Sequence, residues 1–309
     1  MTREQAWVEA AQAGPKAFIA VANRVAGWSY IPQAFLTTTI DKGDGKVRNI
    51  CVPTTLDRTV LSVLLEVLEP LIDPILSESQ HGYRATRLAG HTMVVLRHQG
   101  FARGSTQVVG LRLKEAVCSG YRQVAEADIV RAFPSVSRPL LRELLIADGC
   151  PRSFARYLGR CLGNKQVSRS AKGTPARITG IPLGNPVGPL LFNFFVRTLH
   201  DLDLGDLVLV SYADNFFLAA RTDEDLSEAL KSFKAVLKDD LLLDLKIKQR
   251  WSSDSLEPLS VLQGKKGGGW RIVVSSEGRV RLEPPRKVIS SPSSTTAGEP
   301  RHRKTGGRP

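Results

Sequence analysis

Two aspartates that lie far apart in the sequence, Asp128 and Asp214, each stand beside an apolar segment typical of a β-strand. Two carboxylates held side by side on neighbouring strands can bind a pair of divalent cations, and Mg²⁺ prefers such oxygen ligands. A bound cation pair activates a 3′-hydroxyl, neutralises a transferring phosphate and stabilises the leaving pyrophosphate. Either aspartate taken alone is more typical of a turn. The segments around them must therefore decide between the two interpretations.

The pattern of apolar residues predicts the elements that would position these aspartates. Strands are predicted at residues 46–52, 123–129, 207–212 and 216–219. The last two strands are separated by only three residues, which indicates a hairpin that carries Asp214. Helical periodicity recurs at residues 56–76, 137–148, 186–204 and 223–243, and the first of these helices is expected to end near Pro70 and Pro74. Helices that alternate with an antiparallel hairpin indicate an α+β fold.

The composition is that of a soluble globular protein with a strongly positive charge. Of the 309 residues, 42% are hydrophobic and 24% are charged, a balance that argues against a disordered or membrane-embedded chain. The 43 lysines and arginines outnumber the 30 aspartates and glutamates, giving a formal charge of +13, so nucleic acid is the first partner to expect. The four cysteines form no CxxC pair and have no histidine at metal spacing, so the sequence predicts neither a zinc site nor a disulfide framework.

The two ends of the chain differ from the part between them. Residues 5–25 predict short amphipathic helices interrupted at Gly14-Pro15, so residues 1–37 are expected to form an N-terminal helical extension. Charged residues interrupt this segment, and no apolar run is long enough to span a bilayer, so a cytoplasmic protein without a membrane partner is expected. Residues 288–309 are rich in Ser, Thr, Gly, Pro and Arg and are expected to form a disordered basic tail.

Short motifs occur in a fixed order between these ends. They are Arg48, His81-Gly82-Tyr83-Arg84, Asp128, Gly180-Ile181-Pro182-Leu183-Gly184 and Tyr212-Ala213-Asp214-Asn215. In type and order they resemble the reverse transcriptases encoded by group II introns and their bacterial relatives, which include retron and phage-defence enzymes. The resemblance covers about residues 38–287. It implies the fingers and palm of a right-hand polymerase, with an antiparallel palm sheet flanked by helices and a thumb that is missing or minimal.

The same resemblance implies an RNA-directed DNA polymerase, a nucleotidyltransferase that extends a primer by two-metal chemistry. Its partners would be an RNA template, a primer and dNTPs, with a cognate structured RNA as a further candidate. Its cofactor would be Mg²⁺, or Mn²⁺ in its place. Arg48 would contact the incoming triphosphate, a bidentate task that suits a guanidinium group. The motifs leave open whether the protein serves a mobile element, antiviral defence or a domesticated role.

The resemblance also assigns roles to single residues. Asp128, Ile129 and Asp214 would hold the metal ions, and Asp128, Asp214 and Asn215 would form the catalytic set. Phe133, five residues after Asp128, would be a steric gate that excludes the 2′-hydroxyl of a ribonucleotide. Without the flanking motif, a phenylalanine at this position is more typical of core packing. The residues expected to contact substrates are Arg48, Arg84, Phe133, Pro182, Gly184 and Tyr212.

Three positions depart from the family pattern. Leu183 replaces a glutamine, Gly188 replaces a serine, and Asn215 replaces the second aspartate of Tyr-Ala-Asp-Asp. Asparagine keeps an oxygen acceptor but loses a negative charge. Reduced catalysis, a preference for Mn²⁺ and loss of polymerisation therefore all stay open. The alternative function is a catalytically impaired nucleic-acid-binding protein with a polymerase fold.

A further departure lies downstream of the hairpin. Residues 243–246 resemble the family segment that ends in a Lys-Thr pair. The lysine of that pair, which would donate a proton to pyrophosphate, aligns here with Gln249. Its neighbours Lys248 and Arg250 are both candidates for the role, and the sequence does not decide between them.

Overall fold

The structure is a computed structural model. It describes residues 19–43, 46–84, 87–89, 92–94, 97–98, 101–102, 106–163, 165–168, 176–255, 257–262 and 269–285. Residues 19–26 of the predicted N-terminal extension are helical, whereas residues 1–18 lie outside the described residues. The predicted tail at 288–309 also lies outside them, so its disorder stays a prediction.

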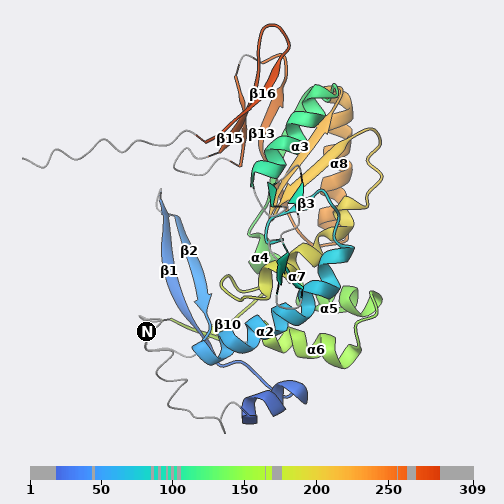
Figure 1. Cartoon of the computed structure of the whole chain (residues 1–309). Helices are drawn as coiled ribbons and strands as arrows, with labels where there is room; N and C mark the ends of the chain where they lie inside the picture. Colours follow the sequence, from blue (N-terminus) through green and yellow to red (C-terminus); the bar gives the residue numbers. More distant parts are fainter. Residues whose placement is uncertain are drawn as a thin grey trace, which may run out of the picture.

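A five-stranded sheet forms the centre of the molecule (Figure 1). Its strands, in spatial order, are β13 (Leu245–Ser252), β8 (Gln123–Ile129), β12 (Asn215–Ala220), β11 (Val208–Tyr212) and β3 (Gln80–His81). β3 runs parallel to β11, and the other neighbouring pairs are antiparallel. The strands predicted at 123–129, 207–212 and 216–219 are therefore confirmed, and the last two form the expected hairpin.

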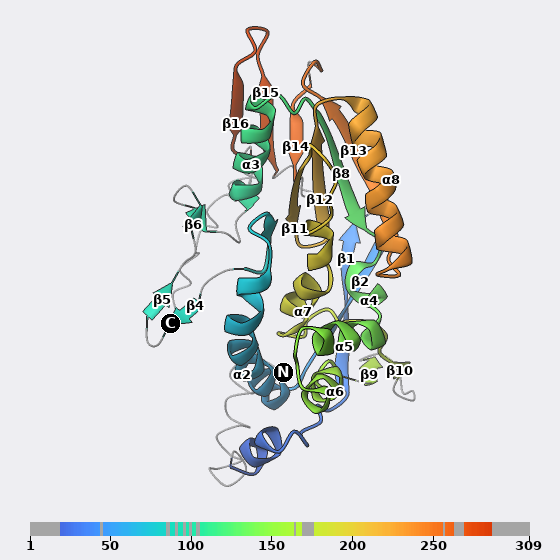
Figure 2. The ribbon, with the colours of Figure 1, turned by 90° about the vertical axis from the view of Figure 1, so that its right-hand side faces the viewer.

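Helices cover both faces of this sheet (Figure 2). On one face lies α8 (Asp223–Asp239), whose Phe233 meets Phe216 of β12 with 5.2 Å between the ring centroids. On the other face lies α3 (Thr106–Cys118), whose Leu113 joins Phe217 of β12 in a second buried cluster. Adjacent residues of β12 thus point into different cores, as the two-residue period of a strand requires.

A second sheet stands beside the first. Its strands, in spatial order, are β10 (Ala176–Arg177), β9 (Lys165–Ser168), β1 (Phe35–Gly43) and β2 (Lys46–Val52). β1 and β2 form an antiparallel hairpin that projects away from the helices at its base (Figure 1). The hairpin leads into α2 (Thr55–Ile72), which begins where Thr54 accepts a hydrogen bond from the main-chain N–H of Asp57 as the N-cap.

Two helices have different bounds from those predicted. α2 continues through Pro70 to Ile72 and then passes into a 3₁₀ turn, η1 (Asp73–Ile75), because a proline in the last turn removes only one hydrogen bond. The segment predicted as one helix at 186–204 forms α7 (Gly188–Phe195) and the 3₁₀ helix η2 (Arg197–His200). A proline at the start of α7 fits its first turn, so the helix begins later than the apolar pattern suggested.

The remaining elements surround this framework. The helices are α4 (Ala132–Ser135), α5 (Arg138–Ala147) and α6 (Arg152–Cys161). A three-stranded sheet of β14 (Leu259–Val261), β15 (Trp270–Val274) and β16 (Val280–Glu283) packs on α3. Two short ladders pair β4 (Arg87–Ala89) with β5 (Thr92–Val94) and β6 (Arg97–His98) with β7 (Phe101–Ala102). The fold is α+β, as predicted, and none of the helices described is both long and apolar enough to cross a membrane.

Candidate active site

The loop between β11 and β12 is a tight turn that presents Asp214. Ala213 adopts a φ of 55°, a left-handed conformation that a residue with a side chain holds only when its surroundings support it. The Ala213 N–H donates a hydrogen bond of 3.0 Å to the His81 carbonyl, and the Ile129 N–H donates one of 3.1 Å to the Asp214 carbonyl. Gly82 permits the close approach, because a Cβ there would lie 2.7 Å from the Ala213 nitrogen. The turn is thus fixed from two sides.

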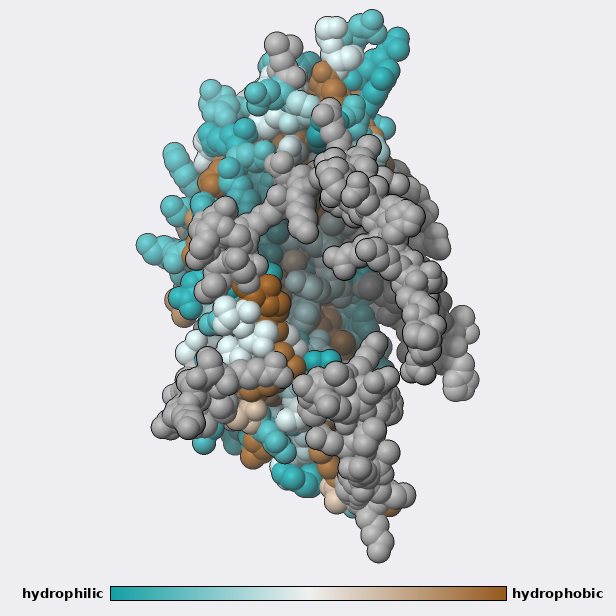
Figure 3. Space-filling model, turned by 90° about the vertical axis from the view of Figure 1, so that its left-hand side faces the viewer, coloured by the Kyte–Doolittle hydropathy of each residue, from teal (hydrophilic) through white to brown (hydrophobic). Residues whose placement is uncertain are grey.

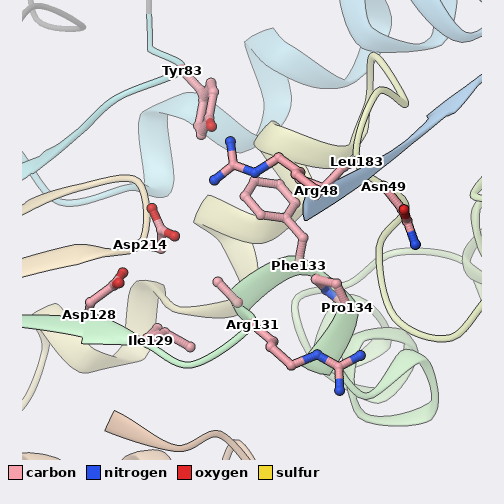
Figure 4. A pocket seen from close by; sticks show the side chains of 11 residues that line it. Arg48, Asn49, Tyr83, Asp128, Ile129, Arg131, Phe133, Pro134, Leu183 and Asp214 are labelled. Carbon is pink, nitrogen blue, oxygen red and sulfur yellow. The ribbon is translucent and has the colours of Figure 1, made fainter. Parts of the chain in front are cut away.

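Asp128 and Asp214 point into the same pocket (Figure 4). Asp128 is next to last in β8, and its partner across the ladder is Asn215, the first residue of β12. Burial raises the pKa of the Asp214 carboxyl, and the negative charge of Asp128 raises it further. Oδ1 of Asp128 is buried and has no hydrogen-bond partner among the described residues. Two carboxylates that repel each other, one with an unsatisfied oxygen, form a setting that a cation would stabilise.

The residues present fit a divalent cation held by oxygen atoms. The side chain of Ile129 is a hydrocarbon without a donor atom, so only its main-chain carbonyl could serve as a ligand. In the part of the chain that the structure describes, no three His, Cys, Asp or Glu side chains gather closely enough to hold a metal ion. Asp128 and Asp214 would therefore rely on water and substrate oxygens to complete the coordination, which is usual for Mg²⁺.

The aspartates lie at one side of a pocket of about 420 Å³, a volume that suits a ligand of nucleotide size. Arg48 enters it from β2, and its positive charge partly offsets the rise in the pKa of Asp214. Seen from the left-hand side of Figure 1, the surface is hollowed near its middle (Figure 3). The pocket is lined by Arg48, Asn49, Tyr83, Asp128, Ile129, Arg131, Ala132, Phe133, Pro134, Leu183 and Asp214.

Phe133 belongs to both the core and the pocket wall. Its ring stacks on Phe192 of α7, with centroids 4.7 Å apart and planes inclined by 20°, and Tyr83 meets it edge-on at 6.1 Å. Only 7% of Phe133 is exposed. The Ile181 N–H donates a hydrogen bond of 2.7 Å to the Phe133 carbonyl, and a Cβ on Gly180 would lie 2.5 Å from the same oxygen. The main chain therefore holds this ring in one place beneath the pocket.

The turn that follows Gly180 joins the pocket to the second sheet. The Cys51 N–H of β2 donates a hydrogen bond of 2.7 Å to the Leu183 carbonyl. Gly184 has a φ of 100°, and a Cβ there would lie 2.5 Å from the Cys51 carbonyl oxygen. Leu183 lines the pocket, whereas Pro182 and Gly184 do not. Those two predicted substrate residues instead shape the turn that holds the base of β2.

Two other predicted substrate residues do not line the pocket. Tyr212 packs against the buried cluster beneath α3. Arg84 is 3% exposed and forms an ion pair of 2.7 Å with Asp73. Its guanidinium also donates hydrogen bonds to the main-chain carbonyls of Ser77, Gln80 and Asp73. With its donors engaged inside the protein, Arg84 holds the turn before Gly82.

Replacing Arg84 by alanine is expected to lower the free energy of unfolding by about 3–5 kcal/mol, because it removes the cation of a buried ion pair with Asp73. Urea denaturation measures this loss. Arg142→Ala is the matched control, since the ion pair of Arg142 with Glu143 is exposed and should contribute less than about 1 kcal/mol. Equal losses in the two variants would show that the buried ion pair contributes no more to the free energy of unfolding than the exposed one.

Glu126, which the sequence did not single out, and Lys248, which it left as a candidate, both lie beside Asp128. Glu126 lies two residues before Asp128 in β8 and is 5% exposed, and burial raises the pKa of its carboxyl. The two-residue strand period could have placed it on the face of Asp128. Lys248 lies 3.4 Å from Oδ2 of Asp128, whereas Arg250 contacts Asp223 at the start of α8. Of the two candidates left by the sequence, the structure brings only Lys248 to the aspartates.

The fold also occurs in solved structures. Telomerase from Candida albicans in complex with a TWJ fragment of telomeric RNA matches 87% of this chain with a TM-score of 0.53 and 11% identity. Apo telomerase from Candida tropicalis, truncated from its C-terminal domain, matches 86% with a TM-score of 0.51 and 12% identity. The chain spans 49% and 59% of those two chains. At such low identity, these likenesses concern the fold alone.

The sequence comparisons identify the family. No curated protein matches the chain. The family described as "Reverse transcriptase (RNA-dependent DNA polymerase)" matches residues 40–252, which are more than half of the chain. The matched residues contain Arg48, Asp128 and Asp214, which converge on the pocket. The chain therefore belongs to the reverse transcriptase (RNA-dependent DNA polymerase) family.

Proposed function

We propose that the protein is an RNA-directed DNA polymerase that extends a primer on an RNA template by two-metal nucleotidyl transfer. The observation that carries the proposal is that the carboxylates of Asp128 and Asp214 share one pocket with the guanidinium of Arg48 (Figure 4). Carboxylates can hold the cations, and the arginine can bind a triphosphate. Membership of the reverse transcriptase family supports the same reaction.

Each part of the pocket has a task in this reaction. Asp128, Asp214 and the Ile129 carbonyl would hold the divalent cations that the family uses, which supply Lewis-acid stabilisation of the phosphoryl group when bound. Arg48 orients the triphosphate through its paired N–H donors. Phe133 leaves no room beneath the sugar for a 2′-hydroxyl. The main-chain hydrogen bonds around Ala213 keep the two carboxylates in place before substrate arrives.

The proposal extends to the parts of a polymerase hand. We assign the central sheet with α3 and α8 to the palm, and the sheet of β1, β2, β9 and β10 to the fingers, within residues 38–287. Residues 1–37 would be a helical extension, and the basic tail at 288–309 would add salt-dependent binding to RNA. The order of the motifs favours a branch close to the group II intron and retron enzymes, with RNA, primer and dNTPs as partners.

One observation favours a second candidate function, a catalytically impaired nucleic-acid-binding protein. Asn215 stands where the family pattern has an aspartate, and its side-chain oxygen accepts a hydrogen bond from Lys248. Its amide also donates a hydrogen bond of 3.3 Å to Oδ1 of Asp214. The neutral amide of Asn215 lacks the negative charge of the aspartate it replaces, and the ammonium group of Lys248 adds a positive charge. Both changes weaken the attraction of the site for a cation.

Primer extension on an RNA template separates the two functions. Asn215→Asp restores a carboxylate beside Asp214, so it is expected to lower the Mg²⁺ concentration for half-maximal extension by about tenfold, equal to about 1.4 kcal/mol of cation binding. Asn49→Asp adds the same charge at a pocket residue that lies apart from the two aspartates (Figure 4), so it should lower this Mg²⁺ concentration less. The requirement is measured by titrating Mg²⁺ at saturating dNTP.

Two results would change this interpretation. If the wild-type protein extends primers efficiently in Mg²⁺ and Asn215→Asp brings no gain, the site works with two aspartates and Asn215 is no impairment. If neither form extends a primer while both bind RNA tightly, the protein is a nucleic-acid-binding protein with a polymerase fold.

A further inference from the structure

A β-bulge in β13 determines which side chains of that strand reach the aspartates. Ile247 pairs with Ala127 and Gln249 pairs with Glu126, so Lys248 is an extra residue without a partner of its own in the ladder. Bulges of this kind bend a strand locally and redirect its side chains. Here both Lys248 and Gln249 turn toward Glu126, and the Gln249 amide donates a hydrogen bond of 2.6 Å to Oε2 of that carboxylate.

The ammonium group of Lys248 contacts three acceptors on two neighbouring strands. Nζ donates a hydrogen bond to Oδ1 of Asn215 on β12. It lies 3.4 Å from Oδ2 of Asp128 and 3.6 Å from Oε1 of Glu126, both on β8. The contact with Asn215 is a hydrogen bond, and the two carboxylate contacts are ion pairs. The side chain of Lys248 is 36% exposed, while that of Glu126 is 6% exposed.

The charges explain why a cation is needed there. Asp128 and Glu126 place carboxylate oxygens 3.4 Å and 3.6 Å from Nζ of Lys248, and Asn215, which the same group contacts, adjoins Asp214. Three carboxylates thus lie near one ammonium group, whose positive charge offsets part of theirs. The one aspartate oxygen within reach of Lys248 is Oδ2 of Asp128, while Oδ1 stays without a hydrogen-bond partner among the described residues. Lys248 thus neutralises part of the site from the side of β13.

On the basis of the proposed function, we propose that Lys248 is a tethered counter-ion, which contacts Asp128 when no metal is bound and must withdraw when a divalent cation binds. The two cations compete for one carboxylate, so Lys248 weakens the affinity of the site for metal. Asn215 contributes to this device, because its neutral oxygen holds the ammonium group by a hydrogen bond without adding a charge. Lys248 is a positioning residue in this role, since it acts on the metal site through Asp128.

Removing the charge of Lys248 while keeping its length tests the proposal without any polymerase assay. Lys248→Met is expected to lower the dissociation constant for Mn²⁺, measured by electron paramagnetic resonance in the absence of nucleotide, by about tenfold, equal to about 1.4 kcal/mol. It should also lower the melting temperature of the metal-free protein by about 1–3 °C. The rise in melting temperature on adding Mn²⁺ should in turn be larger than in wild type.

Lys246→Met is the matched control. Lys246 lies opposite Asp128 in the ladder and loses the same charge, but no ion pair of Lys246 occurs among the described residues. Its Mn²⁺ affinity and metal-free melting temperature should stay close to those of wild type. Asp128→Asn should abolish the binding, which would assign the measured site to the pocket.

The proposal is overturned if Lys248→Met binds Mn²⁺ no more tightly than Lys246→Met, or if Mn²⁺ binding survives Asp128→Asn. Should Lys248→Met fold poorly, Lys248→Gln removes the charge, keeps a donor for Asn215 and is expected to tighten Mn²⁺ binding in the same direction. The proposed polymerase function can fail independently. If the wild-type protein extends no primer but Lys248→Met still tightens Mn²⁺ binding, the counter-ion role of Lys248 stands and the polymerase function is rejected.

Discussion

Replacing Asp214 by asparagine is expected to slow nucleotide addition by about a thousandfold or more, equal to a loss of at least about 4 kcal/mol in transition-state stabilisation. The change removes one of the two pocket carboxylates and leaves the shape of the turn intact, since Ala213 and the main-chain hydrogen bonds of the turn are unchanged. Asp128→Asn should have an effect of the same size. Single-nucleotide incorporation at saturating dNTP and Mg²⁺ measures both rates.

The control for these variants is Asp240→Asn, which changes an exposed aspartate at the end of α8, away from the pocket. Its rate should equal that of wild type. An Asp214→Asn variant that kept more than about a tenth of the wild-type rate would remove Asp214 from the metal-holding set, because a lost ligand should cost far more than the 1.36 kcal/mol that a tenfold change represents.

Shortening Phe133 is expected to let ribonucleotides into the pocket. Phe133→Ala should reduce the preference for dNTP over NTP by about a hundredfold, because the clash that excludes a 2′-hydroxyl disappears together with the ring. The same change should lower the free energy of unfolding by about 3–5 kcal/mol, since the ring is buried against Phe192. Phe133→Leu keeps more of the core volume and should show a smaller change in the same direction. Incorporation of matched dNTP and NTP by each variant measures the preference.

Phe192→Leu separates the two roles of this aromatic pair. Phe192 is fully buried and stacks on Phe133, but it does not line the pocket. Its replacement should therefore lower stability and leave the preference between dNTP and NTP unchanged. If an active Phe133→Leu or Phe133→Ala variant discriminates as well as wild type, Phe133 serves the core alone.

The elements that carry the aspartates could be predicted because their sequence signals are local. The strand at 123–129 has the bounds that its short run of apolar residues predicted. The hairpin at Asp214 followed from two apolar runs with only three residues between them. The helix predicted to end near Pro70 and Pro74 ends between them, at Ile72, because a proline in the last turn is tolerated but the helix does not continue far beyond it.

The surroundings of the aspartates could be predicted only in part, because they depend on contacts between distant segments. The motif around Arg84 predicted a residue near substrate, but the partner that buries Arg84 is Asp73, at the end of α2. Lys248 reaches Asp128 only because of the bulge in β13, and the apolar pattern carries no sign of an extra residue there. Glu126 could have been found from strand alternation alone.

The hydrogen bond from the Cys51 N–H to the Leu183 carbonyl bears on how this pocket could change during evolution. The bond joins two main-chain groups, so replacing the side chain at position 183 leaves the attachment of β2 intact while altering the wall of the pocket. Substitutions at position 183 could therefore change the nucleotide preference of the pocket with little loss of folding stability. The neighbouring Gly184 has no such freedom, because any side chain would collide with the Cys51 carbonyl. Two adjacent positions in one turn would thus accept new residues at very different rates.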